Sequence, residues 1–139
     1  MSVHINLWAV LLAGVASMVI GTIYYMPKVL GNTWMKLAKV DAKRFVKERP
    51  QVMSGVFIAA LVVAYVMAQF MYVEHAFYHA GWMSDALLTA LLAWLGFSFT
   101  TIFVHNALEQ RPARSTYIAW GNRFLSYLAM GLILGWLHP

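Results

Sequence analysis

The chain has 139 residues, of which 62% are hydrophobic, 15% aromatic and 11% charged, and its formal net charge is +5. Since a soluble domain carries about 25% charged residues, this composition excludes disorder and collagen-like repeats and argues against a water-soluble globule. This sequence contains no cysteine, which excludes disulfides, thiolate zinc sites and iron–sulfur clusters.

Four apolar stretches are long enough to cross a bilayer, because a spanning helix needs about 20 residues. They cover about residues 5–26, 51–73, 85–107 and 115–137, and none contains proline. The first stretch lacks the basic flank and the cleavage site of a secretory signal, so we expect it to be retained. We predict an all-α membrane protein with a single domain over residues 1–139. Its fold is an antiparallel four-helix transmembrane bundle with a short cytoplasmic amphipathic helix.

The amphipathic helix is predicted between the first two spans, over about residues 33–47. Apolar residues fall on one helical face and lysines on the other, and Asn32 or Thr33 can cap the start. The apolar face carries Trp34, Leu37, Ala38, Ala42 and Phe45, and the basic face carries Lys36, Lys39, Lys43 and Lys47. Such a helix lies at the membrane surface. It serves either as a topology anchor or as a site for anionic lipid or a partner.

The charges predict the orientation of the spans. Nine of the ten basic residues lie in the two connections that follow the first and third spans, and Arg123 lies inside the fourth. By the positive-inside rule these connections are cytoplasmic, so both termini face outward. The nine are Lys28, Lys36, Lys39, Lys43, Arg44, Lys47, Arg49, Arg111 and Arg114.

Small residues at four-residue spacing predict close helix packing, because lipid offers no hydrophobic drive between helices. The residues are Ala13, Ser17 and Gly21; Ala60, Ala64 and Ala68; Ala86 and Ala90; and Gly131 and Gly135. The last pair forms a GxxxG motif, which can pack inside the bundle or mark the face of a dimer.

Polar side chains are expected to cluster in the cytoplasmic half of the last two spans. The cluster comprises His105, Asn106, Glu109, Asn122 and Arg123. Folding the hairpin brings Arg123 within reach of Glu109, with His105 as a bridge, and the pair offsets the cost of a charge in lipid. This cluster either locks the hairpin or forms a proton-coupled or anion-binding site in a small transporter.

A second group of ionisable residues lies at the outer ends of the spans. It includes His4, Glu74, His75 and His79, and the last two are spaced i, i+4 on one helical face. Imidazole and carboxylate ligands can hold Zn²⁺ or Cu²⁺, but solvated histidines at the interface are the default interpretation. We find no catalytic motif, no cofactor-binding motif and no signature of nucleic-acid binding.

Several short motifs together resemble one bacterial family, catalogued as domain of unknown function 1761. They are Ile5-Asn6, Gly21, Tyr24-Tyr25, Pro27, Leu30-Gly31 and Trp34; Gly96-Phe97, Thr100-Thr101, Asn106, Glu109, Arg111 and Pro112; and Gly131, Gly135 and Trp136. The sequence around Arg123 departs from the family pattern, so the predicted Glu109–Arg123 contact has no support from it. The resemblance implies a four-span protein of the bacterial plasma (inner) membrane and no established activity.

We therefore expect a non-enzymatic, multi-pass membrane protein that acts as a structural or accessory component. Its expected partners are membrane lipids and other membrane proteins or a second copy of itself. Two alternatives remain open. One is a small oligomeric transporter or channel that uses His105, Glu109 and Arg123, and the other is an outward-facing copper- or zinc-binding membrane protein.

Overall fold

A computed structural model describes residues 3–139, and within that range the secondary structure is entirely helical. The six α-helices are α1 (Leu7–Tyr24), α2 (Asn32–Leu37), α3 (Ala42–Tyr78), α4 (Trp82–Ala93), α5 (Thr100–Leu108) and α6 (Ala113–Trp136). A π-helical turn, Pro27–Gly31, precedes α2, and a π-helical segment, Trp94–Phe99, joins α4 to α5. Helix α4, the segment Trp94–Phe99 and α5 thus make one continuous helix, Trp82–Leu108.

Three helices of the described chain are long and apolar enough to cross a membrane: Leu7–Tyr24, Lys43–Tyr78 and Trp82–Leu108. They correspond to the first three predicted spans. Helix α6 has 24 residues but is not among the three. Asn122 and Arg123 lie near its middle and lower its hydropathy.

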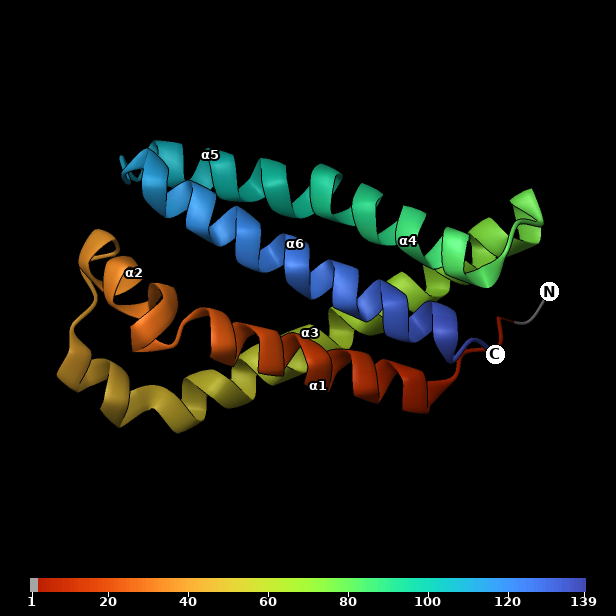
Figure 1. The fold of residues 1–139 in the computed structure, drawn as a ribbon, viewed down its shortest axis with the longest axis horizontal. Helices are drawn as coiled ribbons and strands as arrows, with labels where there is room; N and C mark the ends of the chain where they lie inside the picture. The colour runs from red at the N-terminus through yellow and green to blue at the C-terminus, as the bar shows by residue number, and fades with distance from the viewer. Residues whose placement is uncertain (1–2) are drawn as a thin grey trace.

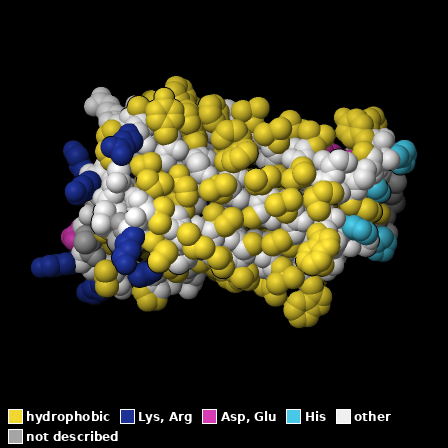
Figure 2. Space-filling view, viewed as in Figure 1, with side chains coloured by type: hydrophobic (Ala, Val, Ile, Leu, Met, Phe, Trp, Pro, Cys, Tyr) yellow, Lys and Arg dark blue, Asp and Glu magenta, His cyan; other side chains and the backbone are white. Residues whose placement is uncertain are grey.

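The long helices pack side by side (Figure 1). Helix α6 contacts both α1 and α4, and α3 contacts the same two helices. The start of α1 and the end of α6 lie at the same end of the molecule, and the α5–α6 turn and α2 lie at the opposite end (Figure 1). The space-filling view shows hydrophobic side chains along the whole length, with lysine and arginine gathered at one end and histidine at the other (Figure 2). An apolar belt between two polar ends matches the chemistry of a bilayer.

Small and flexible side chains fill the core. The buried apolar residues include Ala9, Ala13, Ala60, Ala64, Ala68, Ala86, Ala90, Met67, Met71, Met130 and Leu134. Alanine lets two helix backbones approach closely, which strengthens van der Waals contact in a membrane. Of the small residues predicted to pack, Ser17 is only half-buried, and a Cβ at Gly21 would meet nothing within 4 Å.

The GxxxG motif of α6 packs against α4 of the same chain. A Cβ added at Gly131 would lie 3.0 Å from the carbonyl oxygen of Ala86 and from the Cβ of Ala90. A Cβ added at Gly135 would lie 3.0 Å from the Cβ of Ala86. Both glycines therefore permit a close approach of α6 to α4.

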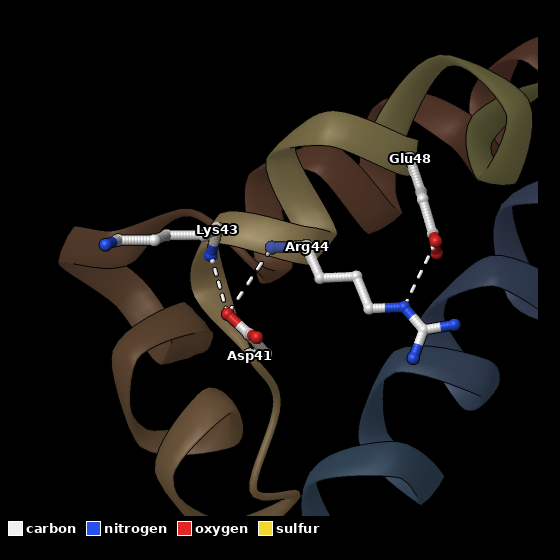
Figure 3. A network of polar contacts seen from close by, with 4 residues as sticks. All are labelled: Asp41, Lys43, Arg44 and Glu48. Carbon is white, nitrogen blue, oxygen red and sulfur yellow. Dashed lines mark hydrogen bonds and ion pairs between the residues drawn. The ribbon is translucent and has the colours of Figure 1, made fainter.

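The segment predicted as one amphipathic helix over residues 33–47 is divided in two. Helix α2 ends at Leu37, Lys39 adopts a left-handed conformation with φ 53°, and α3 begins at Ala42. The Asp41 side chain caps α3 by accepting from the backbone N–H groups of Lys43 at 3.0 Å and Arg44 at 3.4 Å (Figure 3). A capping aspartate favours a new helix start over continuation. The prediction of one uninterrupted surface helix was therefore wrong.

Helix α3 also runs without a break through Pro50, which the sequence analysis placed outside the second span. Proline lacks the N–H that would bond the preceding turn. The Ser54 hydroxyl donates to the carbonyl of Pro50 at 2.8 Å. The predicted second span, residues 51–73, is therefore only part of a 37-residue helix.

Candidate functional site

An aspartate and a histidine form a buried contact where α3 meets α4. Asp85, in the first turn of α4, is 2% exposed, and its Oδ2 lies 2.8 Å from Nδ1 of His75 near the end of α3. A buried carboxylate is costly unless it is paired. Its position in the first helical turn adds a favourable interaction with the helix dipole. The pair therefore fixes the α3–α4 corner.

A second polar contact lies about one turn deeper between the same two helices. The buried hydroxyl of Thr89 donates to Oε2 of Glu74 at 2.6 Å. Glu74 and His75 are neighbours on α3, and their partners, Thr89 and Asp85, lie one turn apart on α4. Polar bonds of this kind hold helices together inside a membrane.

These partners differ from the metal-binding arrangement predicted for the outer histidines. Across residues 3–139, no three histidine, aspartate or glutamate side chains are placed to hold a metal ion together. His79 is exposed and ends α3 in a left-handed conformation with φ 54°. His4 is exposed near the amino terminus of the chain. The structure does not bring His4, Glu74, His75 and His79 together as a ligand set.

The indole of Trp82 extends this corner toward the carboxyl terminus. It stacks on the His75 ring with centroids 3.6 Å apart, and it also lies nearly parallel to the His138 ring at 5.2 Å. Stacked rings of this kind contribute beyond their buried area. The sequence analysis missed the pairing of His75 with Asp85. Their positions on either side of the short turn after α3 were the signal that could have found it.

The polar residues predicted at the cytoplasmic end are arranged differently from the expectation. Glu109 contacts Nε2 of His105 at 3.0 Å through Oε1, and Nε of Arg111 at 2.5 Å through Oε2. The side chains of His105 and Glu109 are 64% and 40% exposed, and Arg123 is exposed. The prediction of a buried Glu109–Arg123 contact was wrong. Gln110 turns the chain with φ 54°, so Arg111 reaches Glu109 from two residues away.

The depth of the α5–α6 turn explains this exposure. The Tyr24 hydroxyl, at the last residue of α1, donates to the carbonyl of Ile118 at 2.7 Å. Helix α6 begins five residues before Ile118, so at the helical rise it extends about 8 Å past the end of α1. His105 and Glu109 therefore lie at the exposed helix tips rather than midway along the bundle.

Two asparagines of the predicted cluster do lie inside the hairpin. Asn106 is buried, and its Nδ2 donates to the buried hydroxyl of Thr116 at 3.0 Å. Asn122 is partly buried, and its Oδ1 has no hydrogen-bond partner among the described residues. The Asn106 contact joins α5 to α6, a role that the sequence analysis gave to Glu109, His105 and Arg123 instead.

Two tryptophans connect the π-helical segment Trp94–Phe99 to α6 through hydrogen bonds and ring stacking. The Trp94 indole donates to the carbonyl of Trp120 at 3.2 Å, and the Trp120 indole donates to the carbonyl of Phe99 at 3.0 Å. The rings of Phe99 and Trp120 stack with centroids 4.1 Å apart. The Ser98 hydroxyl adds a bond to the Tyr127 hydroxyl at 3.0 Å. These polar groups therefore find partners inside the chain, which hydrocarbon surroundings require.

Apolar grooves open on the outside of the molecule. The first lies between α1 and α3, has a volume of about 350 Å³, and is lined by Val15, Met18, Val19, Thr22, Ile23 and Phe57. The second lies between α5 and α6, has a volume of about 210 Å³, and is lined by Phe103, Ala107, Arg111, Ala113, Thr116, Tyr117 and Trp120. We call them the α1–α3 groove and the α5–α6 groove.

The helical fold, the apolar belt and the three long apolar helices are those of a helical membrane protein. The chain belongs to the family described as Protein of unknown function (DUF1761), whose model matches residues 8–135. This match confirms the resemblance found in the sequence motifs. No curated protein and no solved structure matches the chain.

Proposed function

We propose that this chain is a non-enzymatic accessory protein of a bacterial plasma membrane, which packs against another membrane protein through the α5–α6 groove. In this proposal the four long helices form an antiparallel transmembrane bundle. Both basic connections lie in the cytoplasm and both termini lie outside.

The course of α6 supports a fourth crossing. It starts at the basic end of the molecule and returns to the end where α1 begins (Figure 1). Its 24 residues measure about 36 Å at the helical rise, enough to cross the hydrocarbon core. Contacts with α1 and α4 cover two of its flanks, and Asn122 is partly buried, whereas Arg123 stays exposed.

The composition of the α5–α6 groove is the observation that carries the accessory role. Tyr117 and Phe103 are 65% and 55% exposed, and they lie beside Trp120 and Arg111. Aromatic residues and arginine are the residue types that contribute most to protein–protein binding. The neighbouring polar groups, such as Asn106, are already bonded within the hairpin. The groove therefore offers mainly apolar contact area, and the Nε of its charged residue, Arg111, is paired with Glu109.

Site-specific photo-crosslinking in native membranes tests this role. A photoreactive residue at Tyr117 should give a discrete adduct with one other membrane protein. The same residue at Leu132, which is 46% exposed on the outer part of α6, is the matched control and should give none. Adducts with lipid alone at both positions would contradict the proposal.

The transporter alternative has less support from the geometry. Its predicted site at His105 and Glu109 lies at the exposed helix tips. The space between the helix ends near Asn6 and Met71 amounts to only about 10 Å³. Proton or anion flux into vesicles that is lost in Glu109→Gln would favour the transporter over the accessory role.

A further inference from the structure

Helices α1 and α3 pack closely near the middle of α1 and separate toward its end at Tyr24. At the middle a Cβ added at Gly14 would lie 2.6 Å from Cδ2 of Leu61, and Ala13 and Ala64 are fully buried. Two turns further along α1, a Cβ at Gly21 would meet nothing within 4 Å, and the same holds for Gly55 on α3. The α1–α3 groove occupies the space that this separation opens.

Three aromatic rings hold the separated ends apart. Trp34 of α2 lies between Tyr25, which follows α1, and Phe45, in the first turns of α3. The ring centroids are 5.1 Å apart for Tyr25 and Trp34 and 6.1 Å apart for Trp34 and Phe45. Packed aromatic side chains therefore bridge the end of α1 and the start of α3, beyond the basic end of the groove.

The walls of the groove suit a hydrocarbon chain. Five of its six lining residues are apolar. The sixth, Thr22, donates its hydroxyl to the carbonyl of Met18 at 2.8 Å. No lining side chain thus requires a polar ligand, and an unbranched apolar chain can cover Val19 and Ile23 without desolvating a polar group.

The basic end of the groove carries excess positive charge. The segment 28–49 contains seven lysines and arginines and two acidic residues. Asp41 caps α3, and Glu48 pairs with Arg44 at 3.1 Å (Figure 3). The remaining basic side chains are exposed and form no ion pair within the described chain. They are Lys28, Lys36, Lys39, Lys43, Lys47 and Arg49, and we call them the basic collar.

The collar lies where the headgroup of a lipid in the groove would be. Lys28 follows the groove residue Ile23 by five positions, just beyond the end of α1. Arg49 precedes Phe57 by eight residues on α3, which is about 12 Å of helix. Basic residues at the cytoplasmic ends of membrane helices bind anionic lipid headgroups.

We propose that the α1–α3 groove holds an acyl chain of one anionic phospholipid, whose phosphate lies among the basic collar. Charge complementarity favours this occupant over a second copy of the chain, because a second copy would bring a collar of the same sign. The site is separate from the α5–α6 groove, so it can fail or succeed independently of the proposed function.

Lipid retention by the full-length protein tests the proposal. The protein is exchanged into vesicles with equal phosphatidylglycerol and phosphatidylcholine, extracted in mild detergent, and its bound lipids are counted by mass spectrometry. Phosphatidylglycerol should be enriched at least about fivefold. Val19→Trp, which fills the groove, should abolish the enrichment. Val104→Trp, at a similarly exposed position on α5, should leave it unchanged.

The contribution of charge is tested separately. Lys28→Gln with Arg49→Gln should remove the preference for phosphatidylglycerol, whereas Arg114→Gln at the α5–α6 end should retain it. Ile23→Phe is a milder groove-filling variant that keeps the test valid if Val19→Trp does not fold. Enrichment that survives in folded groove variants would overturn the proposal. A wild-type dimer that Val19→Trp converts to monomer would also overturn it, because a second copy would then occupy the groove.

Discussion

His75 on α3 and Asp85 on α4 face each other across the corner between the two helices, with Nδ1 of the imidazole 2.8 Å from Oδ2 of the carboxylate. The carboxylate is almost completely buried, and its helix starts only a few residues after α3 ends. An unpaired carboxylate at this position would be buried without compensation. The contact is therefore a condition for the tight α3–α4 corner.

Substituting the histidine should destabilise the protein strongly. His75→Ala leaves the Asp85 carboxyl buried and without its hydrogen-bond partner, which typically costs about 1–3 kcal/mol. His79→Asn is the matched control, because asparagine tolerates the left-handed conformation of this exposed residue. Denaturant titration in detergent micelles measures the free energy of unfolding. A loss for His75→Ala no larger than that for His79→Asn would contradict the structural role of the pair.

Glycine-to-alanine substitutions should have opposite effects at two positions. At Gly131 the new methyl group would lie 3.0 Å from the backbone oxygen of Ala86, so we expect a loss of about 1–3 kcal/mol from overpacking. At Gly55 nothing lies within 4 Å, so the higher helix propensity of alanine should add up to about 1 kcal/mol. Thermal unfolding of both variants in one detergent measures the difference. Equal stability of the two would show that α6 and α4 do not pack closely at Gly131.

The two polar residues of α5 should differ in the same experiment. Asn106→Ala removes the donor to the buried Thr116 hydroxyl, and a lost partner of this kind costs about 1–3 kcal/mol. Glu109→Gln weakens exposed ion pairs, and such pairs contribute at most about 1 kcal/mol. Asn106→Ala should therefore lower the unfolding temperature clearly more. The reverse order would revive the interpretation of Glu109 as the lock of the hairpin.

Hydropathy predicted the long helices because residue type alone decides whether about 20 residues can enter lipid. The predicted limits 85–107 and 115–137 lie within three residues of those observed, Trp82–Leu108 and Ala113–Trp136. The start of α3 was missed because one capping side chain, Asp41, outweighs the periodicity of the segment around it. A helix cap depends on a single residue, and the hydrophobic periodicity of a whole segment does not reveal it.

The candidate site was harder to predict than the helices. Folding of the hairpin predicted a contact between Glu109 and Arg123. In the structure the left-handed turn at Gln110 brings Arg111 to Glu109 instead. The π-helical segment was missed as well, since no periodic pattern marks a wider helical turn. Its two hydrogen bonds to α6, from the Trp94 indole to the carbonyl of Trp120 and from the Trp120 indole to the carbonyl of Phe99, were missed with it. Which side chains pair across two helices depends on the depth and the rotation of each helix. Both are set only when the helices have packed together.

The fourth crossing can be tested directly because the sequence contains no cysteine, so each introduced thiol is the only one. Arg114→Cys and His138→Cys lie at the two ends of α6, and both side chains are exposed. If α6 crosses the membrane, a membrane-impermeant maleimide added to intact cells should label His138→Cys, and Arg114→Cys should react only after permeabilisation. Lys39→Cys and His79→Cys should repeat this contrast at the two ends of α3, where the apolar length alone predicts a crossing. Labelling of both α6 positions from the same side, with the α3 pair still divided, would leave three crossings and place the carboxyl terminus in the cytoplasm. Both basic connections would remain cytoplasmic in that case, so only the labelling of α6, and not the positive-inside rule, decides between three crossings and four.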